Sequence, residues 1–100
     1  MREIELEVPD GIREDALIRC VQEVCATNNL TCTLKGTLAK YHGSVHWHFK
    51  KDKQKGIVEI TWWKTKQRLW FKVADNRTGE WISASLPKLK EEIEQQLIKS

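Results

Sequence analysis

The sequence predicts an α+β domain with the element order β-α-β-β-β-β-α, in which one five-stranded antiparallel sheet carries two helices packed on one face. Three observations predict it. Five segments alternate apolar and polar residues with the period of a half-buried strand. Two segments repeat apolar residues with a helical period, and the later strands are joined by short connections that favour an antiparallel meander. The 100 residues fit a single domain spanning residues 1–100.

The first elements are a strand and a helix. Residues 2–8 alternate apolar side chains with glutamates, which is typical of a half-buried strand. A Pro-Asp-Gly stretch at residues 9–11 stops this strand. A helix is expected over residues 12–27, with Asp10 as a candidate N-cap and Asn28 near its end.

Four further strands and a second helix follow. The strands are expected at residues 30–35, 44–50, 58–63 and 68–73. After a break at residues 75–79, a helix runs to about residue 97. Pro87 either kinks this helix, or Ser85 caps a second helix at that point. The predicted core contains apolar residues from both helices and all five strands, with three tryptophans among them: Ile4, Leu6, Val21, Leu34, Trp47, Ile60, Trp62, Phe71, Trp81, Leu89 and Ile93.

The strand register follows from the requirement that inward residues face inward residues. It pairs Trp62 with Leu69, and Phe49 with Val58. It also pairs Leu34 with Trp47. Three rows then cross the outer face of the sheet, namely Thr37–Ser44–Trp63–Arg68, Lys35–His46–Thr61–Trp70 and Thr33–His48–Glu59–Lys72.

The order of these elements resembles that of TATA-binding-protein-like folds and helix-grip folds. In those folds, helices cover one face of a curved antiparallel sheet. The resemblance spans the whole chain and rests on no sequence motif, so it implies an architecture and no particular activity.

Charge is distributed unevenly along the chain. The net charge of +3 combines a slightly acidic N-terminal third with a basic middle, because residues 40–72 alone carry a net charge of +7. A basic region of this kind is an argument about binding partners rather than about the fold.

The outer face of the sheet is the candidate binding surface. Two tryptophans on a solvated sheet face are uncommon outside contact surfaces, unless a loop, the C-terminal tail or lysine stems cover them. A lysine-rich loop is expected at the edge of the same face. The predicted binding residues are Trp63, Trp70, Arg68, Lys72, His46, His48, Lys35, Lys51, Lys53 and Lys55.

These residues favour a small domain without catalytic activity that works as a self-association or protein-interaction module. In a homodimer, Trp63 and Trp70 would anchor a self-complementary patch. Another protein could occupy the same face. The alternative is single-stranded nucleic acid or another polyanion, held by stacking on the tryptophans and by the lysines of residues 51–55. The acidic residues of the first strand and the lack of an RNA-binding motif count against this alternative.

Three residues are candidate ligands for a metal ion. His46 and His48 lie two apart on one strand face, which is a spacing that zinc sites use, and Glu59 is predicted opposite His48. Three ligands must converge, however, and Thr61 rather than a ligand is predicted opposite His46. We therefore expect no metal, no cofactor and no catalytic residue, with zinc binding that is millimolar or absent.

The cysteines and the N-terminus indicate a compartment. Three cysteines at residues 20, 25 and 32 form no metal-binding or redox spacing, and structural thiols are the simpler interpretation. The first residues show neither a signal peptide nor a membrane span. We expect a cytoplasmic protein without a membrane partner.

Overall fold

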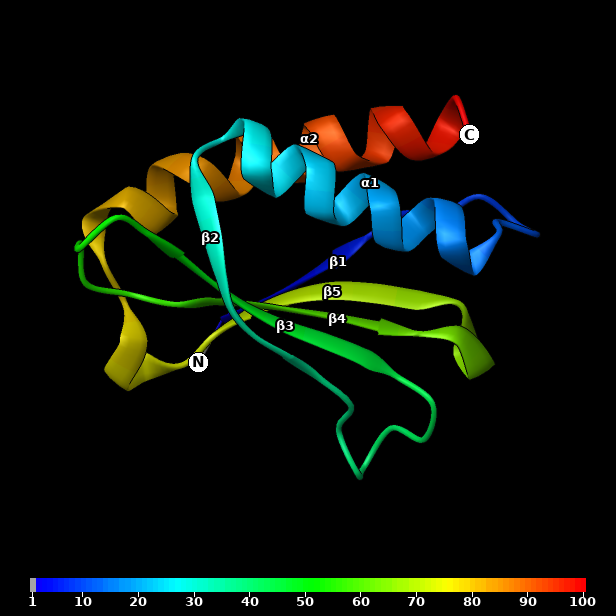
Figure 1. Ribbon diagram of the computed structural model, residues 1–100, viewed down its shortest axis with the longest axis horizontal. Helices are drawn as coiled ribbons and strands as arrows, with labels where there is room; N and C mark the ends of the chain where they lie inside the picture. The colour runs from blue at the N-terminus through cyan, green and yellow to red at the C-terminus, as the bar shows by residue number, and fades with distance from the viewer. Residues whose placement is uncertain (1) are drawn as a thin grey trace.

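The computed structural model describes residues 2–100 and has the predicted α+β architecture (Figure 1). In chain order the elements are β1 (Arg2–Leu6), α1 (Glu14–Thr27), β2 (Leu30–Gly36), β3 (Val45–Lys51), β4 (Val58–Trp63), the 3-10 turn η1 (Lys64–Lys66), β5 (Arg68–Val73), the 3-10 turn η2 (Asp75–Arg77) and α2 (Glu80–Ile98). The strands form one antiparallel sheet in the order β1-β5-β4-β3-β2. Both helices lie on one face of this sheet, the inner face, and the opposite face is the outer face (Figure 1).

The three central strands have the predicted register. Trp47 on β3, Ile60 on β4 and Phe71 on β5 lie in one row across the inner face, and all three are fully buried. Trp62 and Trp81 are also core residues, as predicted. Large apolar side chains at alternate positions force this register, because a slip of one residue would move each of them to the outer face.

The first helix starts later than expected and has a different cap. It begins at Glu14, with Arg13 at the N-cap position and no side-chain cap hydrogen bond. Asp10 lies instead in a turn, where the amide of Ile12 donates to the carbonyl of Pro9 and Gly11 has a φ of +73°. Glu14 and Asp15 lie in the first turn, where their negative charges stabilise the helix by interacting with the positive end of its dipole. The helix ends at Thr27 with Asn28 at the C-cap position, as predicted.

The second helix is a single element that passes through Pro87. Proline removes a helical hydrogen bond, yet apolar residues on both sides of it are buried against the sheet and α1, and this burial holds the two halves in one helix. Ser85 is therefore an interior residue of the helix and caps no second one. No helix in residues 2–100 is long and apolar enough to cross a membrane.

The predicted register of β2 is wrong. A bulge between Cys32 and Leu34 shifts the pairing, so that Leu34 lies opposite His48 rather than Trp47. Leu34 thus points to the outer face, is 46% exposed and does not belong to the core. Lys35, predicted on the outer face, lies instead on the inner side, where its ammonium group donates to Gln22 of α1 at 2.9 Å. The extra residue of a bulge turns every later side chain of the strand to the opposite face of the sheet. The alternation of apolar and polar residues in the sequence does not reveal such a bulge.

Substituting Phe71 with alanine is expected to unfold the domain or nearly so. Truncating a buried phenylalanine typically costs about 3–5 kcal/mol, a large share of the roughly 5–15 kcal/mol that stabilises a domain. Thermal denaturation followed by circular dichroism measures the effect, with Ile98→Ala, a 74% exposed position, as the matched control. A Phe71→Ala variant that melts like the wild type would show that the central register is wrong.

Candidate functional site

Two rows of polar and aromatic residues cross the outer face. The first joins His46, Thr61 and Trp70 across β3, β4 and β5, and the second joins His48, Glu59 and Lys72. Strand β1 extends both rows with glutamates, because Glu5 pairs with Trp70 and Glu3 pairs with Lys72. The rows of the central strands therefore match the prediction, and β2 contributes different residues from those predicted.

A loop covers the predicted tryptophan patch. Residues 37–44 fold back on the side of the sheet away from the helices (Figure 1). The ring of Tyr41 contacts Trp63 edge-on with ring centroids 5.0 Å apart, and Trp70 at 5.1 Å. The indole N–H of Trp63 donates to the carbonyl of His42 at 3.1 Å. Trp70 is consequently only 4% exposed and Trp63 is half-buried, so the expectation of two solvated tryptophans is wrong.

The loop is itself held by hydrogen bonds. The amide of Leu38 donates to the hydroxyl of Ser44 at 3.1 Å, and the amide of Ser44 donates to the carbonyl of Tyr41 at 3.0 Å. Gly43 has a φ of +77°, a backbone conformation that glycine adopts without strain. These contacts fix the position of Tyr41 above the two indoles. The sequence signal for this cover was the one tyrosine of the chain, placed in a connection between two strands.

Arg68 is used within the domain. Its guanidinium lies 4.7 Å from the centre of the Trp70 ring, in a cation–π arrangement. It also pairs with Glu5 of β1, and its Nε donates to Oε1 of Glu5 at 2.9 Å. Its charge is therefore largely satisfied by groups of the same chain.

The predicted lysines do not gather beside the tryptophans. Lys51 ends β3, and Lys53 and Lys55 lie in the loop that joins β3 to β4. This loop is at the opposite end of the strands from the loop that carries Tyr41 (Figure 1). It packs against the start of α2, where the indole N–H of Trp81 donates to the carbonyl of Lys55 at 2.7 Å. Lys35, on the inner side, is separate from both groups.

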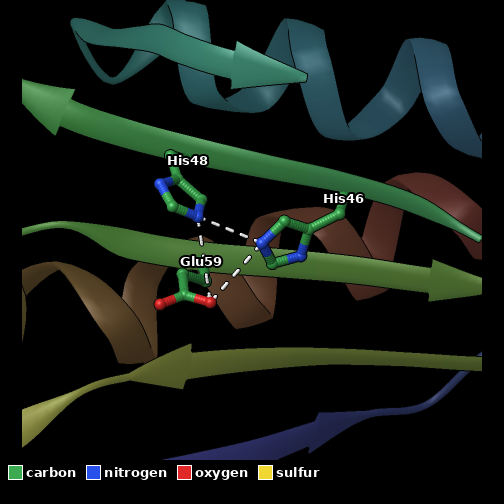
Figure 2. A group of neighbouring side chains, drawn as sticks. All are labelled: His46, His48 and Glu59. Atoms are coloured by element: carbon green, nitrogen blue, oxygen red, sulfur yellow. Dashed lines mark hydrogen bonds and ion pairs between the residues drawn. The ribbon is translucent and has the colours of Figure 1, made fainter. Parts of the chain in front are cut away.

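The two histidines and Glu59 form a compact cluster on the outer face. The Nε2 atoms of His46 and His48 lie 3.1 Å apart, and Oε1 of Glu59 lies 3.4 Å from the first and 3.9 Å from the second. Figure 2 shows the three side chains turned toward one another from β3 and β4. On its other side, Nδ1 of His46 shares a hydrogen bond of 2.8 Å with the hydroxyl of Thr61.

Burial sets the charge state of His46. The imidazole is almost completely buried, and this desolvation lowers its pKa below the ordinary value. Glu59 acts against the shift, whereas His48 and Lys72 reinforce it. His46 is therefore neutral at neutral pH, with a lone pair available on one ring nitrogen.

The cysteines are poor nucleophiles where they are buried. Burial raises the pKa of Cys20 to about 11 and that of Cys25 to about 12. The Cys20 thiol contacts the carbonyl of Ile93 at 3.7 Å. Both thiols stay protonated at neutral pH, which agrees with a structural role. Cys32 is exposed on the edge strand β2.

Removing the ring of Tyr41 is expected to uncover both indoles. In Tyr41→Ala, tryptophan emission should shift to the red and become more accessible to iodide, because Trp63 and Trp70 lose their cover. Melting temperature should also fall, since each aromatic pair contributes about 0.5–1.5 kcal/mol beyond its buried area. Tyr41→Phe keeps the ring and is the matched control. Unchanged emission in Tyr41→Ala would contradict the covering role of the loop.

Several features of this face were accessible from the sequence and one was not. The alternation of β3 and β4 predicted His46, His48 and Glu59 on one face, and it placed Thr61 opposite His46. It gave no indication that the side chain of His46 reaches diagonally toward Glu59. No protein-family model, curated protein or solved structure matches the chain.

Proposed function

We propose that this domain is a non-catalytic, cytoplasmic protein-interaction module that self-associates through its edge strand β2. The observation that carries the proposal is the exposure of this strand: residues 31–36 are all exposed, and Leu34 is 46% exposed on the outer face. Trp63 and Trp70, the anchors expected from the sequence, are covered by Tyr41. These contacts favour the edge of the sheet over its centre as the proposed interaction surface.

An open edge strand is a template for another strand. Its unpaired amides and carbonyls can continue the ladder of the sheet into a second chain. The two edges of this sheet differ in charge. Strand β1 carries Arg2, Glu3 and Glu5, charges that oppose pairing with a copy of itself, whereas β2 carries Lys35 alone.

A second copy of the chain is the occupant that suits β2. Two β2 strands related by a two-fold axis pair in antiparallel fashion, which is the pairing found throughout this sheet. Lys35 is the only charged residue of β2, so pairing of two such strands brings few charges together, and it covers the exposed side chain of Leu34.

The thiols and Ser44 support a cytoplasmic location and a role without catalysis. Three free cysteines suit a reducing compartment such as the cytoplasm. The two buried thiols have raised pKa values, and the hydroxyl of Ser44 is occupied by the Leu38 amide, so these groups are unsuited to nucleophilic catalysis.

The wild-type chain is expected to have a solution mass of twice 11.7 kDa in light scattering at high micromolar concentration. Leu34→Lys places a second lysine on the edge strand and should yield the monomer mass, because the new charge is buried on pairing. Ile98→Lys introduces the same change at the other exposed apolar residue and should remain dimeric. A wild-type monomer, or a dimer that Leu34→Lys leaves intact, would refute the proposal.

The loop between β3 and β4 favours a second candidate function, the binding of a polyanion such as single-stranded nucleic acid. Lys53 and Lys55 are exposed there beside Lys51, within the part of the chain that has a net charge of +7. Because Trp70 is buried under Tyr41, base stacking contributes little to this candidate, and counterion release from phosphates would supply its affinity.

This candidate predicts a strong dependence on salt. The logarithm of the binding constant should fall with the logarithm of salt concentration by about 0.7 per phosphate neutralised. Replacing Lys51, Lys53 and Lys55 with glutamine should flatten that slope in a fluorescence anisotropy titration with a labelled oligonucleotide. The matched control replaces Lys40, Lys64 and Lys66, which are exposed at the other end of the sheet. Equal slopes for the two triple variants would eliminate this loop as the binding site.

A further inference from the structure

We propose that His46, His48 and Glu59 bind a divalent transition-metal ion, with zinc the ion that best suits two imidazoles and one carboxylate. The donors come from adjacent strands, His46 and His48 from β3 and Glu59 from β4. Thr61 lies opposite His46, as the sequence predicts. The imidazole of His46 nevertheless joins the cluster, because it reaches diagonally across the strand pair to Glu59.

The spacing of the donor atoms fits a bound ion. The three distances between them are 3.1, 3.4 and 3.9 Å. In a triangle with these sides, the point equidistant from the corners lies about 2.0 Å from each donor, which is the length of a Zn–N or Zn–O bond. A tetrahedral ion spaces its ligands by about 3.3 Å, close to the average of these distances. Figure 2 shows the three dashed lines enclosing this point.

Thr61 fixes the orientation of one proposed ligand through a hydrogen bond. A histidine that binds a metal through one ring nitrogen usually donates the N–H of the other to a fixed partner. The hydroxyl of Thr61, 2.8 Å from Nδ1 of His46, is such a partner, and it is itself buried. With the proton on Nδ1, the lone pair of Nε2 points at the centre of the cluster. Thr61, which lies opposite His46 and is not itself a ligand, therefore orients the imidazole of His46.

The charges around the cluster suit a cation whose ligands are neutral imidazoles. Glu59 supplies one negative charge, and the burial of His46 keeps that imidazole neutral. Lys72 on β5 lies opposite Glu59, and its positive charge is countered by Glu3, which lies opposite it on β1. Without a metal, the two Nε2 atoms are at hydrogen-bond distance, and with the proton of His46 on Nδ1 the donor is His48. For both Nε2 atoms to bind the ion, the proton of His48 must move to its own Nδ1.

The fourth coordination position is open to the outside of the sheet. The side chains of His48 and Glu59 are 17% and 15% exposed, so water reaches the cluster from the outer face. Three protein ligands with one water is the arrangement of zinc sites that exchange a ligand.

Calorimetry with zinc chloride on the chelator-treated full chain tests the proposal. We expect one ion per chain with a dissociation constant in the micromolar range or tighter. His48→Ala should abolish this binding, because the ion loses one of its three protein ligands. The variant should still fold, because His48 is only half-buried and lies outside the core. Glu59→Gln, which keeps the volume of the side chain, serves if the alanine variant does not fold, with near-ultraviolet circular dichroism of the tryptophans as the folding check.

The chain offers matched controls for both kinds of donor. His42→Ala removes the one histidine outside the cluster, and Cys32→Ser removes the one exposed thiol. Both variants should bind zinc like the wild type. Absent or millimolar binding by the wild type, or binding that survives His48→Ala and disappears in Cys32→Ser, would overturn the proposal.

Thr61→Val separates an orienting residue from a merely structural one. Valine keeps the shape of threonine and removes the hydroxyl, and loss of such a partner typically costs about 10–100-fold in metal affinity. Affinity should also fall once the pH drops below the ordinary imidazole pKa of about 6.5, because a proton then competes with the metal for Nε2 of His46, whose pKa is lowered by burial. Glu59, Lys72 and Glu3 are the other ionisable groups in the row that contains His48. Equal affinity in Thr61→Val and the wild type, or affinity independent of pH, would refute this geometry.

Discussion

The register of β3, β4 and β5 is the constraint on which the rest of the structure depends. Trp47, Ile60 and Phe71 occupy one row of the inner face, and none of them can move to solvent without a large loss of hydrophobic free energy. The same register fixes the outer face, because successive side chains of a strand point to opposite sides. The hydrophobic core thereby decides that His46 faces Thr61 and that His48 faces Glu59.

One end of the outer face is covered, and the cover is polar at its edges. Burying Trp70 and the two polar residues His46 and Thr61 would be costly if their hydrogen-bonding groups lacked partners. His46 and Thr61 bond each other, and among residues 2–100 no buried side-chain nitrogen or oxygen lacks a hydrogen-bond partner. Tyr41 supplies the apolar part of this cover and Arg68 the charged part. The loop of residues 37–44 acts as a third layer over one end of the sheet, with the two helices covering the other face.

The sequence was informative where a pattern had only one physical solution. Large residues alternate without interruption in the three central strands, so both their existence and their register could be predicted. Strand β2 has the same alternation, but its only large apolar residues are Leu30 and Leu34 and the strand is at an edge. A bulge at Cys32–Leu34 therefore costs little and leaves no trace in the pattern. Tyr41 lies in a loop without periodicity, so its position over Trp70 depends on tertiary packing alone. The diagonal contact of His46 with Glu59 depends on side-chain rotamers, which the period of two does not specify.

The two proposed sites are neighbours, and this has a thermodynamic consequence. Leu34, the exposed residue of β2, lies directly opposite His48, one of the proposed metal ligands. A second chain that covers Leu34 also removes water from the side of His48, and electrostatic interactions strengthen when water is removed. If the metal ion favours pairing of the edge strands by some factor, pairing must raise metal affinity by the same factor, because linkage between binding equilibria is reciprocal. The outer face and its β2 edge would then behave as one functional surface, in which the bulge at Cys32–Leu34 places the apolar residue Leu34 beside the proposed metal ligand His48.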